Sequence, residues 1–564
     1  MSEFNLIDEG WIPVIIDYKG TRKLVGLREF FANAHTYISL SGDMPTQDFA
    51  VMRFLLAILH TVFSRYDASG QVYELIEVNN RMQQLEEVYD EDEEEYEDLL
   101  VDTWKDLWNM GKFPDIVNEY LDTWHDRFYL FDEKYPFYQV NKDDVDVSKI
   151  NRKKPSEILG KNINRLVSES GNKKALFSPK YNSNKNKEIL DYDEVVRWIL
   201  TYQGYTGLSD KVIFGKEKYK SSKGWLFDLG GIYLSSSNMF KTLLLNLQLR
   251  NISQAEYNVS IEKPCWEFSP SDIIKKYFQK NSIDNISELY TNWSRAIYID
   301  NFSSDKEFSM KVVKLPEIKH ENQFLESMTI WRYNNNGKNK GKFTPKKHQL
   351  NKSMWRSFGL FTIDYDDYNN TNSKIRKPGI IEWLNFIDKF IEDEMIVINS
   401  ISMEDDGNAT SWLPTNEIND YIYIEESVIN DNNKDGWVEK INSTVENTNE
   451  IIEKVFKNFI KDIKTIRNIE SKDFVSNSLE NLYFEIDKPF RDWLSTINYD
   501  DNKDKKVENW FIEFKKIILK KVNDIIKNSS SRDYTGIIEN DRMKNIATSY
   551  NYFIAKLNKK LRGS

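Results

Sequence analysis

Four amphipathic stretches follow one another after residue 430, and they constrain the fold more than any other feature of the chain. Their apolar side chains recur at intervals of three and four residues over 438–466, 474–497, 507–525 and 543–557. This spacing places the apolar side chains on one face of an α-helix. The connections are short and polar: 470–472, 498–504 and 528–536. Because short loops make consecutive helices antiparallel, the sequence predicts an antiparallel four-helix bundle over 431–564.

The chain before residue 430 lacks a single dominant period. A strong helix is indicated over 46–65, where apolar residues again recur at spacings of three and four. Elsewhere, short strand-like runs alternate with short helices, polar turns and interrupting prolines. We therefore expect an α+β protein, in which a large irregular mixed α/β N-terminal domain over 1–430 precedes the C-terminal bundle over 431–564.

Composition restricts the class of protein further. At 564 residues the chain is too long for one ordinary domain, and 14% aromatic residues are too many for a disordered one. No stretch approaches the roughly 18 consecutive apolar residues of a membrane span, and the acidic start Met1–Asn5 does not resemble a secretion signal. The single cysteine, Cys265, excludes an internal disulfide and a CxxC zinc site. We expect a cytoplasmic protein without a membrane partner.

Charge is distributed unevenly along the chain. The net charge of −12 by itself argues against a nucleic-acid partner, because a polyanion repels a polyanion. Ten of the thirteen residues over 86–98 are acidic, however, which leaves −2 for the rest of the chain. This run is either a solvated helix face or loop, or a patch that docks a partner or repels DNA.

Lysines gather over 171–224 and over 328–360, and the second stretch contains no acidic residue. Lysines on polar, glycine-containing loops suit contacts to the phosphate backbone of a nucleic acid. The alternative is an ordinary solvated surface. The local charge pattern, rather than the net charge, therefore keeps nucleic acid open as a partner.

Catalytic motifs are not evident. The five histidines include no pair at metal-ligand spacing, and the patterns GxxxxGK[ST], GxGxxG and GxSxG are absent. Carboxylates cluster over 364–367 and 404–406, which is typical of turns, although such clusters also attract hard cations. Cys265 lies between a proline and Trp266, which fits a packed small residue better than a nucleophile. We expect no catalytic residue, no bound metal and no cofactor, and hence a protein that is not an enzyme.

Six short segments stand out by their order and spacing ahead of the bundle. They are FNLIDEGWIPV (4–14), LSGDMPTQDF leading into RFLLAI (40–58), DRFYLF with YPFYQV (126–140), PCWE (264–267), YTNWSR (290–295) and MWR (354–356). Together with the bundle that follows them, they resemble the large subunit of the type I-E CRISPR Cascade surveillance complex, the CasA family.

The resemblance implies a non-catalytic subunit at the 5′ end of the CRISPR RNA (crRNA). Such a subunit reads the protospacer-adjacent motif (PAM) of double-stranded target DNA from the minor groove, promotes duplex opening and R-loop formation, and recruits the helicase–nuclease. Minor-groove readers tolerate related motifs and often insert a wedge that unstacks a base step, and guide-RNA pairing then supplies the sequence specificity. The implied partners are the other Cascade subunits, the crRNA 5′ handle, the target DNA and the helicase–nuclease.

The resemblance also assigns DNA-binding residues. The PAM-reading glycine loop falls at 204–211, the basic finger near Arg295, and the wedge, a glutamine in the family, at Asn408 in the turn 406–410. The ordinary alternatives are a helix-terminating loop, an arginine on a strand surface and a common hairpin turn. The implied DNA- and PAM-binding residues are Gly204, Tyr205, Gly207, Ser209, Lys211, Arg295, Gly407, Asn408 and Thr410.

A second set of residues is expected to bind crRNA or a nucleic-acid backbone. The family loop that reaches the crRNA handle falls near Phe177, followed by Lys180 and Lys185. An exposed aromatic beside lysines can stack on a base and pair with phosphates, whereas a core position for Phe177 is the alternative. On charge alone, and whatever the family, the next lysine-rich loop has backbone-binding character at Lys338, Lys340, Lys342, Lys346 and Lys347.

Two other functions remain open on the sequence. The first is a scaffold whose acidic run and bundle dock proteins without contacting DNA. The second is a metal-dependent nuclease, for which metal-stimulated cleavage would be the signature.

Overall fold

The computed structural model of the chain describes residues 4–163, 188–250, 261–279, 282–363, 375–391, 394–408, 411–539 and 541–562. The chain forms two compact units. Unit 1 comprises Met1–Leu350, Tyr365–Phe390 and Asn399–Asn419, and unit 2 comprises Asn351–Asp364, Ile391–Ile398 and Asp420–Ser564. The two units interleave along the chain, and a single domain boundary at residue 430 stays a prediction.

The core of unit 1 is built around α2 (Pro45–Phe63), which is buried along nearly its whole length. It packs against α4 (Ile116–Thr123), α6 (Tyr192–Tyr205) and α9 (Ile286–Tyr290). Of the described helices, α2 alone is long and apolar enough to cross a membrane, although the composition was expected to contain no such segment. Because 94% of its apolar window is buried inside the protein, α2 has the surroundings of a core helix. It is the helix predicted over 46–65.

The described strands that precede the bundle form small sheets rather than one large sheet, and the last two of these strands each have residues in both units. Their orders are β2-β1-β3, β4-β7-β6, β10-β8-β9 and β12-β11-β5. The antiparallel register of β6 and β7 places Arg295 opposite Lys314. The strands are β1 (Ile12–Ile15), β2 (Arg22–Val25), β3 (Ser39–Leu40), β4 (Ser156–Leu159), β5 (Gly230–Ser235), β6 (Arg295–Tyr298), β7 (Ser309–Lys314), β8 (Trp331–Tyr333), β9 (Phe343–Pro345), β10 (Ile375–Arg376), β11 (Met395–Asp405) and β12 (Pro414–Glu425).

The acidic run leads into α3 (Glu93–Met110). Three of its glutamates occupy the first turn of this helix, where negative charge interacts favourably with the helix dipole. Arg250 pairs with Glu97 at 2.8 Å and with Asp98 at 3.3 Å. The other helices of unit 1 are α1 (Leu27–Asn33), α5 (Gly160–Ile163), α7 (Met239–Asn246), α8 (Pro270–Gln279) and α11 (Gly379–Ile387).

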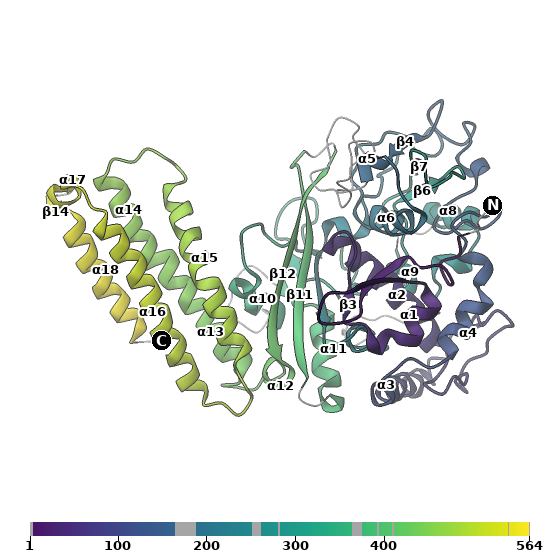
Figure 1. The fold of residues 1–564 in the computed structure, drawn as a ribbon, viewed down its shortest axis with the longest axis horizontal. Coiled ribbons are helices and arrows are strands. Elements are labelled where there is room, and N and C mark those ends of the chain that lie inside the picture. The colour runs from purple at the N-terminus through teal and green to yellow at the C-terminus, as the bar shows by residue number, and fades with distance from the viewer. Residues whose placement is uncertain are drawn as a thin grey trace. The chain divides into compact units, whose positions relative to one another are not determined.

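Unit 2 contains the four long helical stretches that the periodicity predicts, and they lie side by side in Figure 1. The fold class is therefore confirmed. The first stretch is continuous but changes helix type along its length. It consists of α13 (Trp437–Glu450), a π-helical segment (Ile451–Phe456) and α14 (Lys457–Ile466). The others are α15 (Phe474–Ser495), α16 (Lys503–Lys527) and α18 (Ile546–Leu561).

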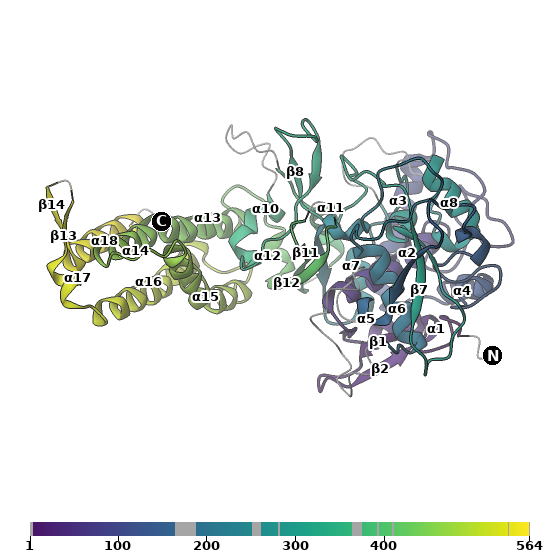
Figure 2. The ribbon, with the colours of Figure 1, turned by 90° about the horizontal axis from the view of Figure 1, so that it is seen from above.

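The last connection of the bundle is more elaborate than the expected polar loop. It contains the short helix α17 (Ser531–Thr535) and an antiparallel pair of strands, β13 (Ile537–Glu539) and β14 (Arg542–Lys544). Figure 2 shows this pair at the end of the bundle. Strands of three residues are too short to leave a periodic signal in the sequence, which is why the pattern did not predict them.

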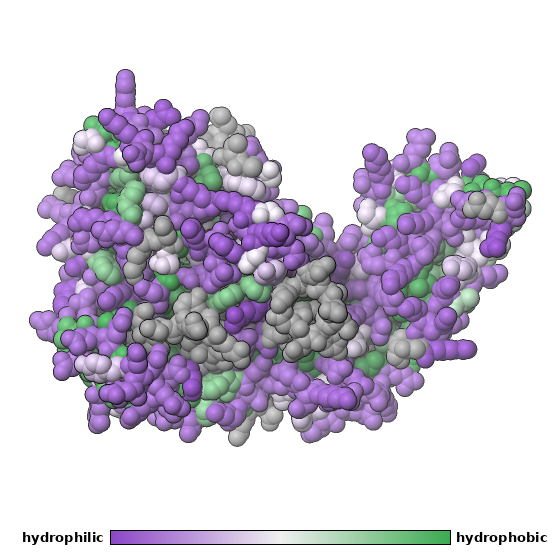
Figure 3. Space-filling view, turned by 180° about the vertical axis from the view of Figure 1, so that it is seen from behind, coloured by the Kyte–Doolittle hydropathy of each residue, from purple (hydrophilic) through white to green (hydrophobic). Residues whose placement is uncertain are grey.

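A segment from before the bundle packs on it within unit 2. The Trp355 ring stacks on Phe490 with centroids 4.2 Å apart, and its Nε1 donates to Asp487 Oδ1 at 2.9 Å. This segment includes α10 (Phe358–Thr362), and α12 (Glu426–Ile429) precedes the bundle directly. On the face shown in Figure 3, hydrophilic residues cover most of the surface of each unit.

Candidate nucleic-acid interface

Two segments about which the sequence made separate predictions meet in unit 1. The loop after α6 and the turn between β11 and β12 touch where Leu208 N donates to Ser411 O at 2.7 Å. A Cβ atom on Gly207 would lie 2.3 Å from the carbonyl oxygen of Trp412. Only glycine allows this approach without a backbone shift. We call residues 206–211, 405–408 and 411–413 together the loop–turn surface.

The turn half of this surface is held by its own carboxylates. Asp405 Oδ1 accepts from Gly407 N at 2.9 Å, and Asp406 Oδ1 accepts from Asn408 N at 3.1 Å and from Leu413 N at 3.2 Å. Gly407 has a φ of 66°, which favours glycine. Gly407 and Asn408 are exposed, whereas the predicted Thr410 lies outside the described residues. The turn therefore presents Asn408 to solvent on an anchored backbone.

Two cations on neighbouring strands fix the loop part of the loop–turn surface. The Arg295 guanidinium donates to Gly207 O at 2.6 Å and to Asp210 Oδ1 at 2.9 Å. On the neighbouring strand, Lys314 Nζ donates to Leu208 O at 2.9 Å. The opposed positions of Arg295 and Lys314 on β6 and β7 bring both side chains to the same loop.

This geometry corrects the prediction for Arg295. Its side chain is fully buried, at 0% exposure, so it cannot reach a DNA groove as a basic finger in this conformation. The physical reason is the ion pair with Asp210, whose side chain is 1% exposed. Arg295 is a positioning residue for the loop.

The glycine-loop residues divide into buried and accessible ones. Tyr205 is 1% exposed, and burial raises its pKa well above the ordinary value, so the prediction that it contacts DNA is also wrong in this conformation. Gly204 serves packing, because a Cβ on this residue would lie 2.9 Å from Cδ1 of Leu226. Gly207 is buried as well, so the prediction that it contacts DNA is wrong in this conformation. Ser209 is half-buried and Lys211 is exposed.

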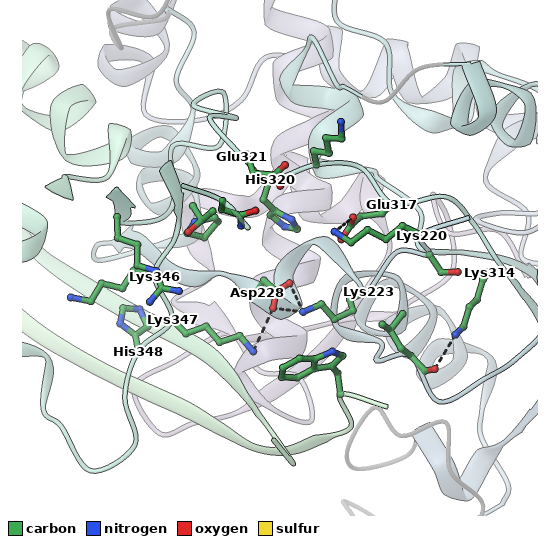
Figure 4. Close-up of a pocket in the computed structure, with 18 of the residues that line it drawn as sticks. Lys220, Lys223, Asp228, Lys314, Glu317, His320, Glu321, Lys346, Lys347 and His348 are labelled. Carbon is green, nitrogen blue, oxygen red and sulfur yellow. Dashed lines mark hydrogen bonds and ion pairs between the residues drawn. The ribbon is translucent and has the colours of Figure 1, made fainter. Parts of the chain in front are cut away.

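A basic cleft of about 720 Å³ borders the loop–turn surface, and Leu208 and Trp412 form part of its wall. Figure 4 shows how its charged side chains converge from several segments. Seven of the lining residues are Lys or Arg and three are Asp or Glu. The seven cations are Lys220, Lys223, Lys314, Lys319, Arg332, Lys346 and Lys347.

Carboxylates hold several of these cations in place. Asp228 accepts from Lys223 at 2.6 Å and lies 3.9 Å from Lys347 (Figure 4). Lys347 also pairs with Asp405 at 3.2 Å. Burial opposes the ionisation of Asp228, but Lys223, His320 and Lys347 outweigh it and hold the pKa below its ordinary value. Burial lowers the pKa of Lys347. Lys319 and Arg332 are exposed and pair with no carboxylate among the described residues.

A buried polar network supports the cleft from the core. The His320 ring stacks on Trp225 with centroids 4.0 Å apart, and Trp225 Nε1 donates to Glu326 Oε2 at 2.7 Å. Arg53 of α2 binds both oxygens of Glu326, at 2.9 and 2.7 Å. Burial opposes the ionisation of Glu326, yet Arg53 holds its pKa below the ordinary value. The central helix thus positions one wall of the cleft.

The predicted backbone-binding lysines of 338–347 lie on or beside the cleft. Lys338, Lys340 and Lys342 are in the loop that joins β8 to β9, and Asn339 of that loop lines the cleft. Lys346 and Lys347, which follow β9, line it as well. Phe177, Lys180 and Lys185 lie outside the described residues.

Sequence reasoning missed several lining residues. Asp228, Lys314, Lys319, His320 and Trp412 were in no predicted site. Residues 314–321 mix two lysines with two glutamates, so their local charge is close to neutral and no basic stretch stands out. Their common position becomes visible only in three dimensions.

Cys265 and its neighbour Glu267 have the surroundings of residues that stabilise the fold. Burial raises the pKa of the Cys265 thiol to about 12. Glu267 pairs with Arg65 at 2.8 Å and accepts from Tyr120 Oη at 2.8 Å. Among the described residues, no group of three or more His, Cys, Asp or Glu is placed to hold a metal ion.

Comparison with known proteins gives consistent matches. The family model for CRISPR-associated protein Cse1 matches residues 5–520. The CRISPR-associated protein CasA/Cse1 of Thermus thermophilus is 28% identical over 275 residues, which is 48% of this chain and 43% of that protein. This sequence match thus spans less than half the length of the relative.

Solved structures share the fold along the whole chain. The crystal structure of Thermobifida fusca Cse1 superposes with a TM-score of 0.78 at 20% identity, covering 99% of this chain and 98% of the other. A chain of a CRISPR RNA-guided surveillance complex superposes with a TM-score of 0.63 at 12% identity, covering 99% of both. At these identities the likeness shows the fold.

Proposed function

Since the chain belongs to the CRISPR-associated protein Cse1 (CasA) family, in agreement with the resemblance in its sequence, we propose that it is the large subunit of a type I-E Cascade complex. In this proposal the loop–turn surface reads the PAM of the target duplex, and the basic cleft binds the adjoining phosphate backbone. The subunit has no catalytic role of its own.

The observation that carries the proposal is the meeting of the glycine loop and the turn at the rim of the basic cleft. A reader of the minor groove needs a narrow edge that reaches the groove floor and cations beside it for the phosphates. Asn408 is exposed on such an edge, the buried Gly207 holds the loop against the turn, and Leu208 and Trp412 connect the edge to the cleft. Contacts to phosphate position the protein, and the edge reads the motif.

Phosphate binding falls first to the cations without a carboxylate partner. Lys319 and Arg332 are exposed on the cleft. When such groups meet phosphates they release counterions, so affinity falls with salt by a slope of about 0.9 per contact. Asp228 instead pairs with Lys223 and Lys347. This pairing fixes the positions of the two lysines and lowers the net positive charge of the cleft.

Duplex opening is assigned to the turn. Asn408 is exposed on a backbone that Asp405 and Asp406 anchor, so its amide can enter a base step while the turn keeps its shape. Unstacking a step costs a few kcal/mol, which the backbone contacts offset. Pairing with guide RNA then extends the R-loop.

The remaining partners follow from the family. We assign the crRNA 5′ handle to the segment with Phe177, Lys180 and Lys185, and backbone contacts to the loop with Lys338, Lys340 and Lys342. The other Cascade subunits hold the chain at that handle, and the helicase–nuclease joins after R-loop formation.

An electrophoretic shift assay with assembled Cascade tests the proposal. A PAM library first identifies the motif that the wild-type complex prefers. The variants Asn408→Ala and Gly207→Asp are expected to abolish the preference for that motif while the complex still assembles. Unchanged PAM-dependent binding in both variants would refute the assignment of the loop–turn surface.

A second arm separates DNA binding from a scaffold role. The double variant Lys319→Glu, Arg332→Glu is expected to weaken duplex binding and flatten its salt dependence, whereas Lys516→Glu, Lys520→Glu makes the same charge change on α16 of unit 2. If both double variants keep the wild-type salt slope, the scaffold function replaces the one proposed.

A further inference from the structure

A second concave site lies entirely within the bundle of unit 2. It is a groove of about 500 Å³ between the long helical stretch 437–466 and α18, and we call it the bundle groove. None of its lining residues is acidic. Four of them are lysines: Lys454, Lys556, Lys559 and Lys560.

The positive charge of the groove is only partly compensated. Glu450, which is outside the lining, pairs with Lys454 at 2.8 Å and with Lys560 at 2.7 Å. Lys556 and Lys559 have no carboxylate partner among the described residues. The one carboxylate therefore pairs with two of the four lysines, and an anionic ligand would meet the uncompensated charges of the other two.

An aromatic wall accompanies this charge. Phe459 and Phe553 pack with ring centroids 5.4 Å apart and are buried at the base of the groove. The Tyr552 ring is 55% exposed, and Lys556 Nζ lies 5.3 Å from its centroid. A flat ligand group can stack on Tyr552 beside a cation.

A buried hydroxyl also points to a ligand. Ser549 is 3% exposed, lines the groove, and its Oγ has no hydrogen-bond partner within the described chain. An unsatisfied buried polar group costs about 1–3 kcal/mol. A ligand with acceptor atoms would remove this cost.

The opposite wall has an unusual backbone. Lys454 and Val455 line the groove from the π-helical segment Ile451–Phe456. Single π-helical turns inside α-helices are rare and are found frequently at functional sites. The groove thus combines uncompensated lysines, an exposed ring, an unsatisfied hydroxyl and a local departure from α-helical geometry.

We propose that the bundle groove binds a nucleotide, with its phosphate on Lys556 and Lys559 and its base on Tyr552. The Ser549 hydroxyl and the amides of Asn447 and Asn458 provide polar contacts in the groove. The nucleotide is either free or one unit of a single strand, since both present the same phosphate and base. An acidic peptide would satisfy the lysines but would leave the aromatic wall unused. The inference goes beyond the proposed function, because it concerns a different unit and a different ligand.

Fluorescence anisotropy with the full chain tests the proposal. A labelled oligothymidylate is the strand probe, and dAMP and inorganic phosphate are competitors. All measurements use the Lys319→Glu, Arg332→Glu background, so that binding at the basic cleft is weakened equally in every sample. Failure of the groove is thereby distinguishable from failure of the proposed function.

The variants address each part of the groove. Lys556→Glu, Lys559→Glu is expected to weaken binding at least about tenfold, because two phosphate contacts are lost. Tyr552→Ala is expected to cost about tenfold through lost stacking, and Tyr552→Phe to restore binding. Ser549→Ala is expected to weaken binding without lowering the melting temperature. Lys516→Glu, Lys520→Glu is the matched charge control.

The outcomes separate the ligand sources. Competition by dAMP at the affinity of the strand indicates a free nucleotide, and tighter binding of the strand indicates single-stranded nucleic acid. The proposal is overturned if Lys556→Glu, Lys559→Glu binds like the matched control. It is also overturned if polyglutamate or inorganic phosphate competes as well as the nucleotides, because the site would then recognise charge alone.

Discussion

The basic cleft of unit 1 and the bundle groove of unit 2 are both rich in lysine but differ in how the charge is compensated. In the cleft, Asp228 sits between Lys223 and Lys347, and Glu317 pairs with Lys220. In the groove the lining contains no acid, and Glu450 outside the lining pairs with only two of the four lysines. Paired lysines keep fixed positions and attract phosphate less strongly, whereas unpaired lysines attract it without fixing its register. The cleft is therefore suited to positioning a duplex, and the groove to sequence-tolerant binding.

The two sites also differ in what holds them. The loop beside the cleft depends on a buried ion pair, Arg295 with Asp210, and on the hydrogen bond from Lys314 to Leu208. The groove depends on apolar helix packing, with Phe459 against Phe553. Removing one charged side chain should therefore destabilise the loop beside the cleft more than it destabilises the bundle groove.

Replacing Arg295 by alanine is expected to have the largest effect. It leaves the Asp210 carboxylate buried without its main partner, which typically costs about 3–5 kcal/mol. The free energy of unfolding, from urea titration, and hydrogen exchange over 206–211 measure the loss. Arg28→Ala removes exposed ion pairs with Asp8 and Asp122 and is expected to cost at most about 1 kcal/mol. Equal losses in the two variants would show that the buried pair is not what holds the loop.

Replacing Gly207 by alanine is expected to have the next largest effect. Its Cβ would lie 2.3 Å from the Trp412 carbonyl oxygen, so the loop and the turn must separate, at a cost of about 1–3 kcal/mol. Hydrogen exchange of the Leu208 amide reports this separation. Gly407→Ala is the comparison, because the space around it is open and only its φ of 66° is strained. A wild-type exchange rate at Leu208 in Gly207→Ala would contradict the close contact.

Reversing Lys319 and Arg332 to glutamate is expected to act on binding rather than stability. The slope of log affinity against log salt should fall by about two, since two phosphate contacts disappear. Titration of assembled Cascade with target duplex at several salt concentrations measures the slope. An unchanged slope would place the phosphate path away from the cleft.

The smallest expected effect belongs to Asp228→Asn. The pKa of Asp228 in the folded chain is below its ordinary value of 3.8, so the carboxylate stabilises the fold above that pH and the stabilisation is lost as the pH falls through the folded value. The variant should be less stable by up to about 1 kcal/mol at neutral pH and should converge with wild type in acid. Urea midpoints across this range measure the difference, and a gap that widens in acid would contradict the sign.

The bundle could be predicted from sequence because its information is local. Each stretch repeats its apolar spacing over many residues, so the helices of 431–564 can be predicted without knowing which other helices they pack against. The family resemblance also rests on short contiguous segments. Neither depends on contacts between distant parts of the chain.

The candidate site depends on such contacts, which is why its prediction was partly wrong. Arg295 follows a polar turn in the sequence, which suggests an exposed position. No neighbouring residue in the sequence identifies Asp210 as its buried partner. The contact between Gly207 and Trp412 likewise joins residues far apart in the chain. The sequence was sufficient to predict the loop and the turn as separate segments. Only the three-dimensional structure shows that the two segments meet beside one cleft.

A crosslinking measurement on assembled Cascade tests most directly whether the loop–turn surface reads the PAM. A photoreactive amino acid replaces Asn408, and its crosslinks to target DNA are mapped with the preferred PAM and with a substituted one. The same group at Phe484, which is 84% exposed on α15, is the control. We expect crosslinks from position 408 to the PAM base pairs or the adjoining step, and we expect them to disappear when the PAM is substituted. Crosslinks elsewhere on the DNA, or the same yield with both duplexes, would contradict it.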